Sequence, residues 1–143
     1  VATSDANQAL ALDRLGRHAE ALAKHEEGLA MRRKMFTGDH GAVALSLFSR
    51  GDSLLVLGRA EEALASHLDS LAMRRRLVAG DHPDTVWSLA RVSACLLALD
   101  RRDEALERAE EAVAMAQRAS PEGHPARVAS EVALNAARAL TPR

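Results

Sequence analysis

The sequence predicts an all-α protein built as a solenoid of antiparallel helix hairpins, and three observations support this fold class. Tyr is absent from the 143 residues and only two Phe and one Trp occur, while Ala, Leu, Arg and Glu are frequent, which favours helix over sheet. Apolar residues recur at steps of three and four, the spacing of one helix face. Strings of sequence also return at a fixed distance along the chain, as they do in repeat proteins.

The repeat period is 42 residues. Residues 1–42 and 43–84 are identical at 20 positions, which chance does not explain. The recurring strings are LGR (15–17 and 57–59), EAL (20–22, 62–64 and 104–106), LAMRR (29–33 and 71–75) and GDH (38–40 and 80–82). We therefore predict a single repeat domain over 1–143, with units 1–39, 40–81 and 82–123 and a half unit 124–143.

Each unit is predicted to fold as two helices joined by a tight turn. In the third unit Val86, Leu89 and Val92 lie on one face of the first helix. Only three residues, LGR or LDR, separate it from the second helix, so the pair must be antiparallel. Gly16 and Gly58 suit the left-handed cap of such a turn. The predicted helices are 2–15, 18–36, 42–57, 60–78, 84–99, 102–118 and 126–140.

Small residues stand at equivalent places in the two helices of each hairpin. Ala21, Ala63 and Ala105 occur early in the second helix, and Gly51 and Ser93 occur in the first. Small side chains allow helix axes to approach to the short end of the ~8–10 Å packing range. We therefore expect a closely packed seam inside each hairpin.

These motifs resemble the 42-residue tetratricopeptide repeats of kinesin light chains and many bacterial regulatory proteins. The matching residues of the third unit are His82, Pro83, Asp84, Leu89, Val92, Leu96, Glu104, Ala105, Ala112 and Val113. Those of the second unit are His40, Leu47, Gly51, Leu54, Gly58, Glu62, Ala63 and Leu71. The resemblance implies a right-handed superhelical solenoid of about three and a half units and seven helices.

The chain departs from this family pattern at several positions. Arg50 replaces an apolar core residue, Asp100 replaces the turn glycine, and His25 and His67 replace a large aromatic residue. The paired Asn residues that contact a peptide backbone in kinesin light chains are also absent. Phe48 and Ser49, then Ala90 and Arg91, occupy those places.

The resemblance implies that the first helix of each unit lines a concave groove. The groove residues it indicates are Leu45, Phe48, Ser49, Asp52, Leu55 and Val56 in the second unit and Trp87, Ala90, Arg91, Ala94, Leu97 and Ala98 in the third, followed by Val132 and Ala136. This surface is apolar and holds two of the three aromatic side chains, which are common anchors in partner binding.

We therefore expect a scaffold, part of a larger protein, that binds a protein partner through a peptide or amphipathic helix. One alternative is a regulatory sensor for a small hydrophobic ligand or signalling peptide. Another is that the groove is packed shut by neighbouring helices. The last helix, with Val128, Val132 and Leu140, is a candidate for self-association into a homo-oligomer.

Charge and hydropathy argue against other partner classes. A net charge of -1 gives no overall attraction to nucleic acid or anionic membrane. A single cysteine, Cys95, and the lack of a membrane-spanning apolar run or secretory leader predict a cytoplasmic protein.

We expect no enzyme activity, cofactor or metal. The string Gly51-Asp52-Ser53-Leu54 copies the nucleophile block of GDSL esterases, but its Asp-x-x-His partner is missing and Ser53 falls within a predicted helix. The histidines recur once per repeat, too far apart to share one ion. The basic clusters 32–34 and 74–76 end predicted helices, where positive charge stabilises the helix dipole, although a ridge for an acidic peptide or RNA stays an alternative.

Overall fold

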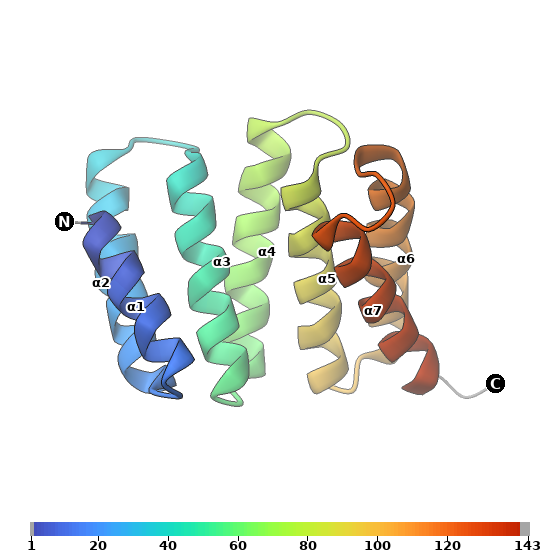
Figure 1. The fold of residues 1–143 in the computed structure, drawn as a ribbon, viewed down its shortest axis with the longest axis horizontal. Helices are drawn as coiled ribbons and strands as arrows, with labels where there is room; N and C mark the ends of the chain where they lie inside the picture. The colour runs from blue at the N-terminus through green and yellow to red at the C-terminus, as the bar shows by residue number, and fades with distance from the viewer. Residues whose placement is uncertain (1, 141–143) are drawn as a thin grey trace. The chain divides into compact units, whose positions relative to one another are not determined.

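Seven α-helices make up residues 2–140, which are the part of the chain that the computed structural model describes, with side chains from residue 5 onward. Within these residues there is no strand, and every helix boundary lies within one residue of its predicted place. The helices are α1 (Ala2–Arg14), α2 (His18–Met35), α3 (Gly41–Val56), α4 (Ala60–Leu77), α5 (Pro83–Ala98), α6 (Arg102–Ala119) and α7 (Pro125–Leu140). The all-α prediction is therefore confirmed (Figure 1).

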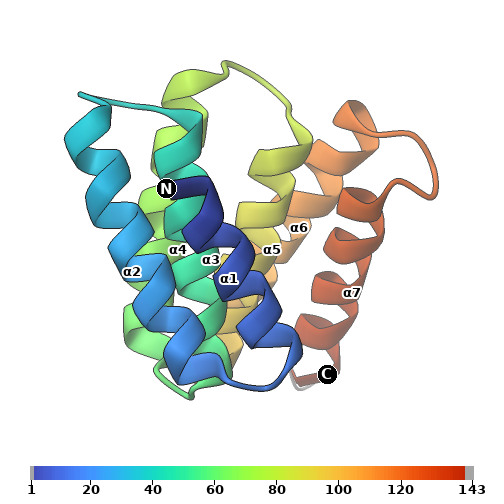
Figure 2. The same ribbon diagram turned by 60° about the vertical axis from the view of Figure 1, so that its left-hand side comes forward.

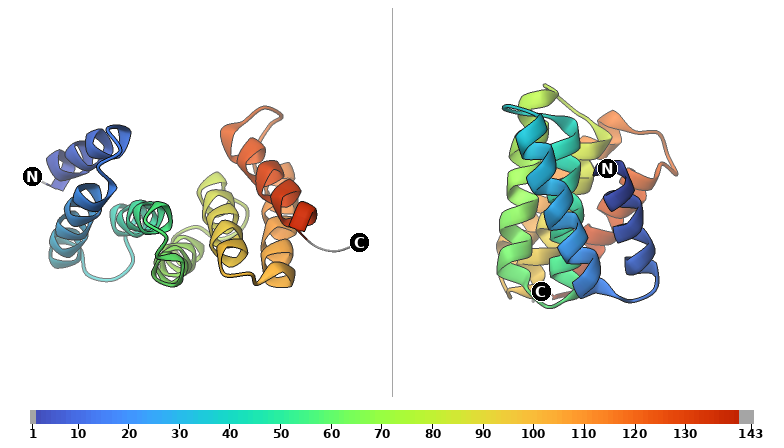
Figure 3. Two further views of the ribbon diagram at one scale, coloured as in Figure 1. Left: turned by 90° about the horizontal axis from the view of Figure 1, so that it is seen from below. Right: turned by 90° about the vertical axis from the view of Figure 1, so that its left-hand side faces the viewer.

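The helices are grouped in two compact units, Val1–Met73 and Arg74–Arg143. In the first unit α2 packs against both α1 and α3, and the hairpin of α1 and α2 is clear in Figure 2. In the second unit α5, α6 and α7 pack against one another in pairs, as the end-on view in Figure 3 shows. The predicted division into units of 42 residues stays a prediction.

The turn inside each hairpin has the same backbone geometry three times. The residue in left-handed conformation is Gly16 (φ 72°), Gly58 (φ 75°) or Asp100 (φ 58°). The N–H of the following arginine bonds back to a carbonyl five residues earlier, as from Arg59 to Leu54 at 2.9 Å. This is the Schellman motif, which satisfies carbonyls at a helix end. The glycine prediction is confirmed, and aspartate takes the same role in the third turn.

The same arginine also joins the turn to the next helix. Arg59 forms two hydrogen bonds with the carboxylate of Glu62, at 2.8 and 2.7 Å. Arg17 with Glu20 and Arg101 with Glu104 repeat this pair. In all three pairs the hydrogen bond from arginine lowers the pKa of the glutamate. The LGR and EAL strings recur together because they build one local structure.

The hairpin seam is tightly packed, as the small residues predicted. Ala21, Ala63 and Ala105 are fully buried. In the second unit the Ser93 hydroxyl donates a hydrogen bond to the Ala105 carbonyl at 2.8 Å. In the first unit the Ser70 hydroxyl donates to a carbonyl of α3 at 2.7 Å. Buried serines thus hold the two helices of a hairpin together at short range.

Arginines near the ends of α2 and α4 connect one hairpin to the next. Arg74 donates a hydrogen bond to the hydroxyl of Ser88 in α5 at 2.8 Å, and Arg32 donates to Ser46 in α3. Both serines are buried. Sequence analysis assigned these arginines to the helix dipole, with a ridge for an acidic peptide or RNA as the alternative. It did not foresee that their guanidinium groups bond to the first helix of the next hairpin.

Helix α7 differs from α5 on the side where α5 packs against α6. Leu89 and Leu96 of α5 are buried, but the residues 42 positions later, Glu131 and Arg138, are exposed. The small residues Ala126, Ser130 and Ala137 instead form the buried face of α7. Helix α7 therefore covers the α5 and α6 pair with one narrow face and turns a polar face to solvent.

We expect replacement of Ala63 by Leu to lower the free energy of unfolding by about 1–3 kcal/mol, because the fully buried seam has no room for three more carbon atoms. Thermal melts measure this effect. The same substitution at the exposed Ala65 of α4 is the matched control and should leave the melting temperature unchanged. Equal melting temperatures for the parent and Ala63→Leu would contradict the packing of the hairpin.

We expect Asp100→Gly to raise the free energy of unfolding by about 0.5–1 kcal/mol. The left-handed backbone conformation of Asp100 costs a residue with a Cβ atom about 1–2 kcal/mol, and glycine would remove this cost. Part of the stability gained in this way is offset by the greater conformational freedom of glycine in the unfolded chain. The exposed Asp100 and Arg102 pair contributes little. Chemical denaturation tests this, with Asp100→Ala as the control: it keeps a Cβ atom at positive φ and should therefore be no more stable than the parent.

Candidate functional site

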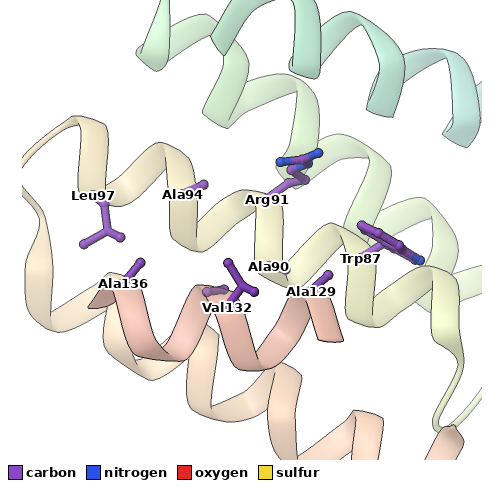
Figure 4. A pocket seen from close by; sticks show the side chains of 9 residues that line it. Trp87, Ala90, Arg91, Ala94, Leu97, Ala129, Val132 and Ala136 are labelled. Atoms are coloured by element: carbon purple, nitrogen blue, oxygen red, sulfur yellow. The ribbon is translucent and has the colours of Figure 1, made fainter. Parts of the chain in front are cut away.

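An apolar pocket lies between α5 and α7 in the second unit. Its volume is about 230 Å³. The residues that line it are Trp87, Ala90, Arg91, Ala94 and Leu97 of α5 and Ala129, Val132, Ala133 and Ala136 of α7. Figure 4 shows Leu97 and Ala136 at one end, Trp87 and Ala129 at the other, and Val132 between them.

Helix geometry explains why these residues meet. Steps of three and four residues place them on one face of each helix. The alanines leave a hollow where the two helices run side by side, and the larger Trp87, Leu97 and Val132 form its walls. Val132 is 62% exposed, so the pocket opens to solvent along α7. Such a hollow can receive an apolar side chain.

Five of the six residues that the sequence indicated in the third unit line this pocket, together with Val132 and Ala136. The sixth, Ala98, is exposed at the end of α5 and lies outside the lining. Sequence analysis missed Ala129 and Ala133, although the repeat contains the signal for them. They lie 42 positions after Trp87 and Arg91, just as Val132 and Ala136 lie 42 positions after Ala90 and Ala94. The two walls of the pocket therefore share four repeat positions, and α5 adds Leu97, whose counterpart at position 139 does not line the pocket.

The groove residues predicted in the second unit lie on α3. Leu45 and Val56 are more than half exposed, at 53% and 60%. Phe48, Ser49, Asp52 and Leu55 are partly buried. Their participation in one groove with the residues of α5 stays a prediction.

Phe48 is held by a buried histidine of α4. The rings of Phe48 and His67 meet edge to face with centroids 5.1 Å apart. His67 is fully buried, and its Nε2 atom lies 3.4 Å from Oδ1 of Asp52. Gly51 makes room for the imidazole, since a Cβ atom there would lie 2.6 Å from Nε2. The histidine thus fills the place of the family's large aromatic residue, and residue 51 must be glycine to accommodate it.

The geometry around Ser53 does not support hydrolysis. Ser53 is only 2% exposed within α3, and the residue 42 positions later, Cys95, is fully buried. Position 53 is therefore a core position of the repeat. A serine nucleophile must reach its substrate, which this burial prevents.

The histidines that begin successive units have a structural role. Nδ1 of His40, His82 and His124 accepts a hydrogen bond from the N–H two residues later, at 3.1, 3.1 and 3.2 Å. Among the residues that the structure describes, no group of three or more His, Cys, Asp or Glu side chains could hold a metal ion. The repeated histidine is thus a helix cap, which sequence analysis described only as repeat punctuation.

Two arginines near helix ends have partners within the chain; sequence analysis considered the first, Arg75, for an acidic ligand and did not consider the second, Arg118. Arg75 pairs with Glu111, and Arg118 forms two hydrogen bonds with Asp81 at 2.6 and 3.1 Å. The Arg118 hydrogen bonds lower the pKa of Asp81. These pairs reduce the positive charge that the helix ends could offer an acidic ligand.

A second, polar hollow of about 340 Å³ lies among α2, α3 and α4 in the first unit. Arg50 lines it and pairs with Glu26 at 3.3 Å. The residue 42 positions later is the buried Val92, so the hollow occurs where arginine replaces an apolar core residue. Its other lining residues are Leu29, Ala30, Arg33, Leu47 and Asp69.

No helix within residues 2–140 is long and apolar enough to span a membrane.

Comparison with known proteins identifies the repeat. Models of the tetratricopeptide repeat family match residues 42–118 and residues 1–41. The chain is similar to a crystal structure of nearly identical TPR-like repeats of a predicted kinesin light chain from Podosopora anserina. The two structures superpose with a TM-score of 0.79, their sequences are 23% identical, and the alignment covers 96% of this chain and 65% of that chain. A point variant of those repeats has a TM-score of 0.82 with the same identity and coverage. No curated protein sequence matches the chain.

The chain thus spans just under two thirds of the length of these solved repeats, at 65%. Their likeness establishes the fold, and the family models establish the kind of repeat. Proteins of this family generally mediate protein–protein interaction and act as scaffolds. From its period, its hairpins and these matches, the chain belongs to the tetratricopeptide repeat family.

Proposed function

We propose that this chain binds an apolar segment of a protein partner, either an amphipathic helix or an extended peptide, and forms part of a larger cytoplasmic scaffold. The observation that carries the proposal is the pocket between α5 and α7. Its lining is apolar except for Arg91, and it opens beside the exposed Val132. Exposed apolar surface of this kind is typical of an interaction site.

The size of the pocket favours a side chain of a partner over a whole small molecule. Ligand pockets usually measure about 300–1,000 Å³. A hollow of about 230 Å³ is smaller and suits one or two apolar side chains. Trp87 at one end supplies the large rigid surface that anchors partner segments.

A regulatory sensor for a small hydrophobic ligand is the second candidate, because the same apolar lining would suit such a molecule. Native mass spectrometry of the purified chain distinguishes the two. A bound small molecule that is lost on Trp87→Ala would favour the sensor, whereas a ligand-free chain that binds peptides would favour the scaffold. Neither function requires a catalytic group, a cofactor or a metal.

Self-association through α7 is a further part of the proposal. Val128, Val132 and Leu140 are 48%, 62% and 48% exposed on this helix. Two copies that pair through these residues would bury Val132 and so compete with a partner for the pocket. Sedimentation over a range of concentrations measures this equilibrium.

Val132→Glu should weaken binding of a peptide selected from a displayed library by more than ten-fold, because a carboxylate would have to be desolvated inside the pocket. Asn135→Glu adds the same carboxylate on the same helix at an exposed residue outside the pocket lining and the proposed self-association surface, and is the control. Titration by calorimetry gives both affinities. Equal losses for the two variants would argue against the pocket.

Trp87, the single tryptophan, provides a second measurement. It is partly buried in the free chain, so a partner that fills the pocket should shift its fluorescence emission to shorter wavelength by excluding water. Phe48→Ala should leave this shift intact if the partner contacts only α5 and α7, and should weaken it if the partner also contacts α3. An emission maximum that no selected peptide changes would contradict the proposed site.

A further inference from the structure

The pocket between α5 and α7 offers few hydrogen-bonding groups to a ligand. Seven of its nine lining residues are Ala, Val or Leu, and only Trp87 and Arg91 carry a polar atom in the side chain. Both of these side chains are donors, and neither can accept a hydrogen bond. The backbone groups in the middle of a helix bond to one another. The lining therefore has no side-chain acceptor for a backbone N–H of a partner.

The serine hydroxyls of α5 and α7 are used inside the fold. Ser88, Ser93 and Ser130 are fully buried, and none of them lines the pocket. The Ser93 hydroxyl donates a hydrogen bond to the Ala105 carbonyl at 2.8 Å, and the Ser130 hydroxyl donates to the Arg127 carbonyl at 2.7 Å. These oxygen atoms are therefore not available to the backbone of a partner segment.

Such a lining distinguishes two kinds of partner segment. An extended segment depends on its surroundings for hydrogen bonds to its backbone, and a backbone group that is buried without a partner is costly. A helix satisfies its own backbone groups and presents side chains to the surface that it covers. An apolar lining without acceptors is therefore compatible with a helix and unfavourable to an extended segment.

The length of the lining also suits a short helix. On α5 it runs from Trp87 to Leu97, about 15 Å along the helix, and on α7 from Ala129 to Ala136, about 10 Å. About two to three turns of a third helix cover this length. The five alanines of the lining would allow the axis of that helix to approach to the short end of the ~8–10 Å packing range.

Charge adds a second requirement on the partner. Among the nine lining residues Arg91 alone is ionisable, so the lining carries a positive charge and no carboxylate. Figure 4 shows this side chain at the edge of the hollow, on the side of α5 away from α7. Complementary charges at an interface favour the correct partner and the correct orientation. An acidic residue beside the apolar face of a bound helix would meet this requirement.

We infer that the partner segment of this pocket is an amphipathic helix of about two to three turns, with aliphatic side chains on the covered face and an acidic residue at the edge beside Arg91. The inference rests on the proposed binding function and makes it more specific, since it excludes an extended peptide. It assigns the conformation and the charge of the segment.

Two synthetic peptides of identical composition test the conformation. In the first, Leu recurs at steps of three and four residues with one Glu beside this apolar face. In the second, Leu alternates with polar residues, so that the peptide is amphipathic only as a strand. Calorimetric titration of the chain measures both affinities. We expect the first peptide to bind at least about ten-fold more tightly, because the second buries backbone groups without partners.

Val132→Glu shows whether binding occurs at the pocket, and Cα chemical shifts of the isotope-labelled first peptide should indicate a helix in the bound state. If the alternating peptide binds equally well or better, and loses affinity in Val132→Glu, the helix is overturned while the proposed function stands. Extended shifts in the bound first peptide have the same meaning. If Val132→Glu changes the affinity of neither peptide, the proposed site itself is contradicted.

Replacement of Glu by Gln in the first peptide tests the charge. It should weaken binding to the parent chain and have no effect on binding to Arg91→Gln, in which the positive charge of the lining is absent. The helical shifts of the bound peptide should be the same in both proteins. An equal loss of affinity with the parent and with Arg91→Gln would overturn the assignment of an acidic residue beside Arg91.

Discussion

Close approach of the two helices within a hairpin is the constraint on which the other features depend. It requires Ala21, Ala63 and Ala105 to be small and fully buried. It also requires a tight turn between the two helices, and this turn needs a residue that tolerates positive φ, such as Gly16 or Gly58. Each hairpin meets these requirements at the same repeat positions, although Asp100 replaces glycine in the third turn. The period of 42 residues therefore follows from the packing within the hairpins.

Much of the fold could be predicted because its determinants are local. Helix ends, turn glycines and small seam residues are set by neighbours in the sequence, and all of them were identified. Asp100 was recognised as a departure but its conformation was not predicted, since sequence alone does not show that aspartate takes the left-handed conformation there. The histidine that recurs at the start of each unit was identified as a marker of the repeat. Its hydrogen bond to the helix N-terminus was not predicted, because that bond depends on the rotamer of the ring.

The candidate site could be predicted in part, and the reason for the limit is physical. Residues on one face of α5 follow from spacing, so Trp87 and Leu97 were identified. The residues that face them from α7 depend on which helices pack together. Of these, sequence analysis predicted only Val132 and Ala136. The place of Arg50 beside Glu26, and of His67 against Gly51, depends on contacts between helices that no local pattern encodes.

Eight of the nine residues that line the pocket between α5 and α7 come from the same four positions in two consecutive copies of the repeat, and Leu97 of α5 is the ninth. The four positions hold Trp87, Ala90, Arg91 and Ala94 in one copy and Ala129, Val132, Ala133 and Ala136 in the other. The two walls of the hollow can therefore be varied one at a time. Substitution at these four positions in one copy alters one wall and leaves the buried seam residues Ser93 and Ala105, which hold the hairpin of α5 and α6 together, unchanged.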